Sequence, residues 1–206
     1  MQRETGFRRL VNFSDAVVAI AITLLILPLA DAASSIGNES LSSFFQHNQT
    51  KILAFGLSFA VIGSFWWGQH QLFERVRAYN GVLVWGMFVW LLSIVFLPFP
   101  TELISSASKG PVEVHALYIG TMLVTAGATL AQQWAIVRWP ELQEKAPDDV
   151  VTLDAAVISV VLMGLALVGT IVVPSLGLWP LVVLLLSRPL ERLMAARRRG
   201  TRPLRS

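Results

Sequence analysis

Long apolar blocks with few charges constrain this chain more than any other feature of its sequence. Because a membrane-spanning helix needs about 20 apolar residues, five blocks are long enough to cross a bilayer. A sixth block is weaker, since its apolar part ends at Ser187 and its full length must include Arg188 and Glu191. The predicted spans are Leu10–Leu29, Ile52–Leu72, Val82–Phe99, Ala116–Val137, Ala155–Val173 and Leu176–Leu193.

The composition agrees with a membrane protein. Hydrophobic residues make up 54% of the chain and charged residues only 14%, against about a quarter charged in soluble domains. No cysteine is present, which excludes disulfides and cysteine metal sites. Basic residues gather at the ends of apolar blocks, a distribution that favours lipid headgroups and gives no support to nucleic-acid binding. The first block exceeds a signal-peptide core in length, so we expect it to be retained.

The basic residues also predict the orientation of the chain. Of the 16 Lys and Arg residues, all but Lys51 and Lys109 lie at block ends on the side of the amino terminus. This bias favours two cytoplasmic termini and therefore an even number of crossings. We predict an all-α, polytopic membrane protein with six transmembrane helices, a membrane domain over residues 1–193 and a basic cytoplasmic tail over residues 194–206.

The first span carries an acidic residue that is unusual inside a membrane. Asp15 lies about one and a half turns inside the inner end of the span, where an unpaired carboxylate is costly. By depth alone, Arg9, His70 and Asn80 can share its cytoplasmic layer. Two interpretations stay open: a structural polar clamp, and a network that supports an ion path.

Another face of the first span carries an apolar stripe. Ile20, Leu24 and Leu27 follow the spacing i, i+4, i+7, with Thr23 beside them, whereas Asp15 is rotated about 140° from Ile20. Such a stripe is most often ordinary helix packing. An apolar ring can also gate an ion path by dewetting, and a threonine hydroxyl can help coordinate a cation. Spacing alone does not choose between these interpretations.

The motifs of the first three spans resemble a known family. The pattern Arg9-x-x-x-Phe13-Ser14-Asp15, followed by Ala19-Ile20 and Thr23-Leu24, is similar to the signature of the endosomal and lysosomal potassium channel family and its bacterial homologues. The last three spans match this family in layout only. Further matching residues are Ser58-Phe59, Phe65-Trp66, His70, Asn80 and the segment 97–101.

The resemblance implies a pore built from several subunits. In the family the bacterial members form homotetramers, and the first helix of each subunit lines the pore. The resemblance assigns the apolar constriction, a hydrophobic gate, to Ile20, Leu24 and Leu27, and assigns potassium preference to Thr23. A single six-helix repeat indicates a multi-pass protein of a prokaryotic cell membrane. The implied polar network comprises Arg9, Phe13, Ser14, Asp15, His70 and Asn80.

The expected function is therefore passive conduction of potassium with weak selectivity among monovalent cations. The expected partners are identical subunits, membrane lipids and the permeating cations, with no cofactor, no metal beyond potassium and no nucleic acid. The alternative is a proton-coupled secondary transporter that uses Asp15 and His70, although no internal repeat is visible. An enzyme is disfavoured, because His47 and His115 are predicted on the side opposite His70 and no catalytic acids converge.

Overall fold

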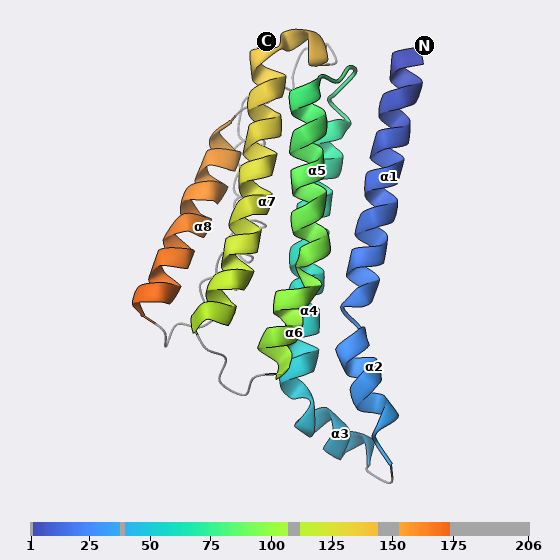
Figure 1. The fold of residues 1–206 in the computed structure, drawn as a ribbon, viewed down its shortest axis with the longest axis vertical. Coiled ribbons are helices and arrows are strands. Elements are labelled where there is room, and N and C mark those ends of the chain that lie inside the picture. The colour runs from blue at the N-terminus through green and yellow to red at the C-terminus, as the bar shows by residue number, and fades with distance from the viewer. Residues whose placement is uncertain (1, 38–39, 107–111, 144–152, 174–206) are drawn as a thin grey trace, which may run out of the picture.

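The computed structural model describes residues 2–37, 40–106, 112–143 and 153–173, and these residues form a helical bundle (Figure 1). An isolated β-bridge between Val76 and Gln143 is the only strand-like pairing in these ranges. The helices in chain order are α1 (Gln2–Leu24), α2 (Leu27–Ser34), α3 (Leu41–His47), α4 (Gln49–Phe73), α5 (Gly81–Phe96), α6 (Pro98–Ser106), α7 (Val112–Arg138), the 3-10 helix η1 (Pro140–Leu142) and α8 (Asp154–Val172).

Within the described residues, five helical stretches are long and apolar enough to cross a membrane, and they correspond to the first five predicted spans. Consecutive stretches run in opposite directions through the bundle (Figure 1). The prediction of an all-helical polytopic protein is confirmed to this extent. The sixth predicted span and the basic tail lie outside the described residues. The five stretches are Gly6–Ser34, Gln49–Phe73, Gly81–Ser106, Val112–Arg138 and Asp154–Val172.

Prolines explain the two interruptions within these stretches. Helix α1 ends at Leu24 and α2 begins at Leu27, because Pro28 has no N–H to donate to the carbonyl of Leu24 and its ring crowds that carbonyl. A second break lies at Leu97, between α5 and α6. The predicted end of the third span at Phe99 is wrong, since the helix resumes and continues to Ser106. Pro98 and Pro100 occupy the first turn of α6, where a missing N–H costs nothing.

Buried polar side chains join the helices inside the bundle. The Ser58 hydroxyl of α4 lies 2.8 Å from Thr101 Oγ1 of α6 and 3.0 Å from the Tyr118 hydroxyl of α7. Nearer the other end of α4 and α7, Gln69 Nε2 donates a hydrogen bond to Gln132 Oε1, and both residues are buried. Such bonds hold helices together in lipid, where burial of apolar surface provides little driving force.

A glycine allows α5 to approach α7 closely. A Cβ atom added at Gly86 would lie 2.8 Å from Cγ of Gln132, a distance that real Cβ atoms do not tolerate. We expect Gly86→Ala to destabilise the protein by about 1–3 kcal/mol, because the buried Gln132 side chain, which accepts the hydrogen bond from Gln69, would have to shift. Thermal unfolding in detergent would measure this loss. Gly127→Ala on α7 is the control, since its added Cβ meets nothing within 4 Å, and equal stability of the two variants would contradict the prediction.

Candidate functional site

Helix α1 has one buried face and one uncovered face. The buried residues recur at steps of three, four or seven, the repeat expected for a helix that packs along one side. Helix α1 packs against α4, α5 and α6. The opposite face is not covered by any of the residues that the structure describes. The buried residues are Phe7, Ser14, Val18, Ala21 and Leu25, and the uncovered ones include Phe13, Ala16, Ile20, Thr23 and Leu24.

The residues predicted to form the constriction lie together on the uncovered face. Ile20 is 61% exposed in the single chain, and Leu24 and Leu27 are 40% and 50% exposed. Leu27 follows the proline-induced break and therefore belongs to α2. An apolar surface of this extent on a membrane helix can contact lipid, pack against another subunit or form part of the wall of a pore.

The Thr23 hydroxyl proton is already donated in a hydrogen bond within the helix. Its Oγ1 donates a hydrogen bond of 2.8 Å to the carbonyl oxygen of Ile20, one turn earlier. This bond leaves the lone pairs of the exposed hydroxyl oxygen free to accept a hydrogen bond or to coordinate a cation. Thr23 can therefore act as an oxygen ligand on the same face as Ile20.

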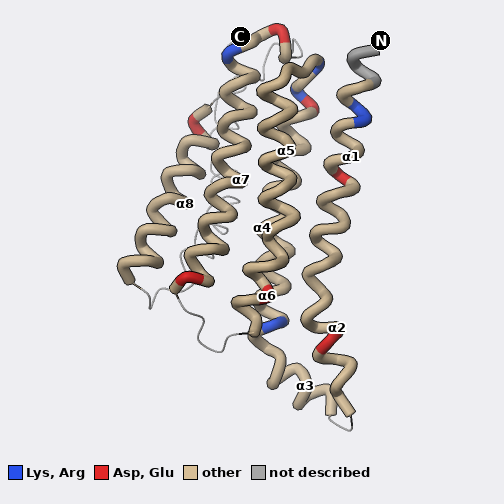
Figure 2. The backbone as a smooth tube through the Cα atoms, in the orientation of Figure 1, with Lys and Arg blue, Asp and Glu red and all other residues tan. Residues whose placement is uncertain are grey.

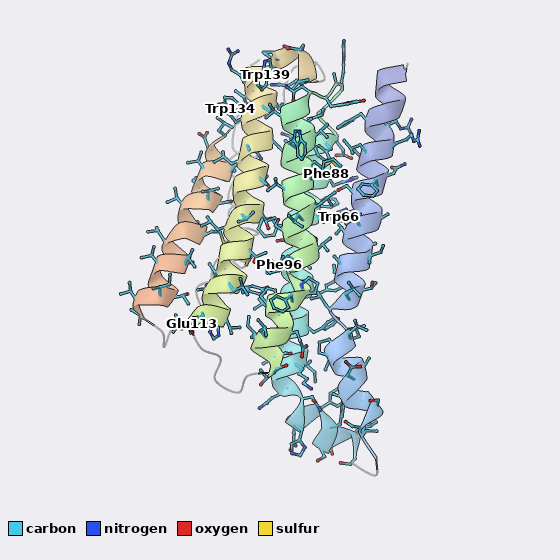
Figure 3. All side chains as sticks on the ribbon, viewed as in Figure 1. Trp66, Phe88, Phe96, Glu113, Trp134 and Trp139 are labelled. Atoms are coloured by element: carbon cyan, nitrogen blue, oxygen red, sulfur yellow. The ribbon has the colours of Figure 1, made fainter. Side chains whose placement is uncertain are left out.

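The acid of the first span is paired with a tryptophan. Trp66 Nε1 on α4 donates a 2.8 Å hydrogen bond to Asp15 Oδ1, and Figure 3 shows Trp66 between α4 and α1. The ring of His70 stacks on Trp66 with the centroids 5.5 Å apart, and its Nε2 lies 3.4 Å from Glu74 Oε1. Asp15, Trp66 and His70 thus form one connected group that joins α1 to α4.

The other predicted members of the polar network lie apart from this group. Asn80 caps α5, because its Oδ1 accepts a 2.9 Å hydrogen bond from the backbone N–H of Leu83. Arg9 is exposed, and among the described residues it forms no ion pair with Asp15. Ser14 is buried on the packed face of α1, whereas Phe13 is half exposed.

The role of Trp66 was missed when the sequence was considered alone, although the tryptophan was quoted as part of the family pattern. The signal that could have found it is its side chain, a large apolar ring with a single N–H donor. Such a donor is suited to a carboxylate at the same depth in the membrane. Depth in the membrane pointed to Arg9, His70 and Asn80 and did not identify Trp66.

Charged residues lie mainly at the two ends of the bundle (Figure 2). Within the described ranges, Asp15 is the acid that lies well inside a span. Lys51 lies in the first turn of α4, at the end of the bundle opposite the start of α1. The described part of the chain contains no group of three His, Cys, Asp or Glu residues that could hold a metal ion. The end where α1 begins carries Arg8, Arg9, Arg75, Arg77 and Arg138.

These features define a multi-span helical membrane protein with an uncovered apolar face on its first helix and an acid–tryptophan pair beside it. Residues 9–98, from α1 to the start of α6, match the family model described as the endosomal/lysosomal potassium channel TMEM175. Over these residues the chain is similar to the TMEM175 channels. The matched family and the relatives are ion channels, which supports the prediction that the protein is not an enzyme.

Bacterial relatives extend the similarity to most of the chain. A potassium channel of Chryseobacterium sp. (strain P1-3) is 26% identical over 187 residues, which cover 90% of this chain and 94% of the relative. A potassium channel of Chamaesiphon minutus is 36% identical over 128 residues, or 61% of this chain and 62% of the relative. The crystal structure of a lysosomal potassium-selective channel TMEM175 homolog from Chamaesiphon minutus matches with a TM-score of 0.72 and 25% identity, covering 91% of this chain and 98% of that one.

Proposed function

We propose that the protein is a potassium-permeable channel whose pore is lined by α1 of each subunit. The observation that carries this proposal is the placement of Ile20, Thr23 and Leu24 on a face of α1 that the described part of the chain leaves uncovered. The bacterial relatives named as potassium channels support the choice of ion. The proposed location is a prokaryotic cell membrane, with six crossings per subunit and both termini in the cytoplasm.

The proposed assembly is a homotetramer around a central axis. Four copies of α1 would turn each uncovered residue into a ring, so that Ile20 forms the narrowest apolar layer and Leu24 and Leu27 form further layers outward. Such a ring controls conduction by excluding or admitting water. The free lone pairs of Thr23 would offer oxygen ligands beside the constriction. Selectivity among monovalent cations is weak in this proposal, since an apolar ring does not replace the hydration shell of one particular ion.

In this proposal the group of Asp15, Trp66 and His70 supports the pore and does not carry ions. The Asp15–Trp66 bond ties α1 to α4, and the buried Ser14 beside it faces the bundle. Asp15 is about 140° around the helix from Ile20, so one residue can hold the helix while the other faces the axis. Arg9, Phe13 and Asn80 complete the proposed supporting network.

The experiment that tests the proposed function is a flux assay in liposomes. We expect the purified chain, reconstituted under a potassium gradient, to pass potassium passively and to show discrete single-channel currents in planar bilayers. Sodium should pass to a lesser degree, and a large organic cation such as N-methyl-D-glucamine should not pass. Potassium movement that requires a proton gradient and shows no discrete currents would favour the proton-coupled transporter, with Asp15 and His70 as its titrating groups, and would overturn the channel.

A further inference from the structure

The amino-terminal end of α1 is held by an aromatic cluster formed by Phe7, Phe73 and Tyr79. Phe7 is only 6% exposed, although it lies two turns before Asp15 and near the start of the helix. Its ring meets the edge of Phe73 at the end of α4, with centroids 5.5 Å apart and an interplanar angle of 81°. On its other side it stacks on Tyr79, with centroids 5.9 Å apart and an angle of 19°.

The Tyr79 side chain also lies against Gly6, the residue that precedes Phe7. A Cβ atom added at Gly6 would lie 3.0 Å from the Tyr79 hydroxyl oxygen, so the absence of a side chain at Gly6 leaves room for the tyrosine. Tyr79 is itself 41% exposed, and its ring can therefore contact the helix while its hydroxyl reaches water. The contact between α1 and the link from α4 to α5 thus involves two consecutive residues of α1.

The link that carries Tyr79 is fixed in turn to the end of α7. Val76 forms the isolated antiparallel bridge with Gln143, and the backbone N–H of Arg77 donates a 2.9 Å hydrogen bond to the carbonyl of Leu142. Val76 and Leu142 are both buried. Gln143 Nε2 donates to the carbonyl of Ile136 within α7, at 3.1 Å. The position of Phe7 is therefore tied, through this link, to a long helix in the middle of the bundle.

Helix α1 consequently has two attachment levels on the side where it begins. One is the aromatic cluster at Phe7, and the other is the Asp15–Trp66 hydrogen bond, about 12 Å further along at 1.5 Å per residue. Val18 and Ala21 pack on the bundle further along, and the contact at Phe7 extends this attachment to the start of the helix, where it limits the tilt of α1. Ile20 lies about 20 Å beyond Phe7, so a change of tilt at Phe7 would displace the proposed constriction.

We propose that Phe7 and Tyr79 are positioning residues for the pore. They hold the start of α1 against the α4–α5 link and so keep the face of Ile20 and Thr23 directed at the shared axis. This inference rests on the proposed channel function. It adds a determinant that does not contact the permeating ion, and one of its two residues, Phe7, lies before the matched residues 9–98.

Single-channel recording of Phe7→Ala tests the proposal. Loss of two aromatic contacts should lower the open probability by about fivefold or more, with an unchanged unitary current, since the constriction itself keeps its residues. Tyr79→Phe is the matched control, because it keeps the stacked ring, and its open probability should equal that of the parent. If Phe7→Ala does not elute as an assembled protein, Phe7→Leu replaces it in the recording, with a smaller expected loss of open probability. Parent-like open probability in both Phe7 variants would overturn the proposal.

The absence of native cysteine permits a second, geometric test. In the double variant Phe7→Cys, Tyr79→Cys, a short bis-thiosulfonate reagent should link the two positions within one chain and restore the open probability lost by the substitutions. Failure to crosslink, or crosslinking without recovery, would overturn the positioning role. A parent protein without potassium current would overturn the proposed function, while the crosslink would still report whether α1 contacts the link.

Discussion

The substitution Ile20→Asn should raise the single-channel potassium current and weaken discrimination between potassium and sodium. Four amide groups in place of an apolar ring would keep water in the constriction and remove the dewetting barrier. A barrier lowered by only about 1.4 kcal/mol corresponds to a tenfold faster passage, so an increase of several-fold or more is expected. Bilayer recordings and reversal potentials in mixed potassium and sodium solutions would measure both effects.

The chain offers a matched control for this substitution. Ile171 on α8 is 56% exposed, close to the 61% of Ile20, so Ile171→Asn introduces the same polar group on a comparably uncovered surface. We expect its unitary current and reversal potential to equal those of the parent. If Ile20→Asn also left both quantities unchanged, Ile20 would not be at the constriction. If both variants changed them equally, the effect would come from membrane perturbation and not from a pore ring.

The second large effect is expected from separating Asp15 and Trp66. Trp66→Phe keeps an aromatic ring beside His70 but removes the donor that pairs with Asp15 Oδ1. Hydrogen bonds to charged groups contribute about 1.5–3 kcal/mol, and because Asp15 is only partly buried we expect a loss near the lower end. Thermal unfolding should show this loss, and the fraction of reconstituted protein that conducts should fall with it.

A double-mutant cycle isolates this bond from other effects of the substitutions. Asp15→Ala and Trp66→Phe should each destabilise the protein, and the double variant should lose less than the sum of the two, with a coupling energy above about 0.5 kcal/mol. Trp67→Phe is the control, since Trp67 also stacks on His70 but is 44% exposed and forms no hydrogen bond with Asp15. Additive losses, or an equal effect of Trp67→Phe, would show that the bond does not hold α1.

The sequence predicted the membrane helices well because their length is set by the thickness of the bilayer. Five of the predicted spans reappear as helical stretches, and the interruption before Pro28 follows from the chemistry of proline. The third span was predicted too short. Its predicted end was Phe99, whereas Pro98 and Pro100 fit the first turn of a new helix, α6.

The candidate site was predicted in part. Helical periodicity placed Ile20, Thr23 and Leu24 on one face, and none of the described residues covers this face. The partner of Asp15 was not predicted correctly, because depth along the membrane normal defines a layer and leaves the direction within that layer open. Trp66 lies on the side of α4 that faces Asp15 and donates the hydrogen bond. Asn80 instead caps its own helix, α5, and Arg9 is exposed.

The sequence by itself determined which segments can cross the membrane and which residues share a face of the first helix. Both properties depend on local periodicity and apolar length, which neighbouring residues specify. Only the tertiary structure decided which face of α1 is packed, which donor meets Asp15, and how Phe7 reaches Tyr79. These contacts join residues far apart in the chain, and they depend on the rotation of each helix about its axis, which the packing of the whole bundle sets.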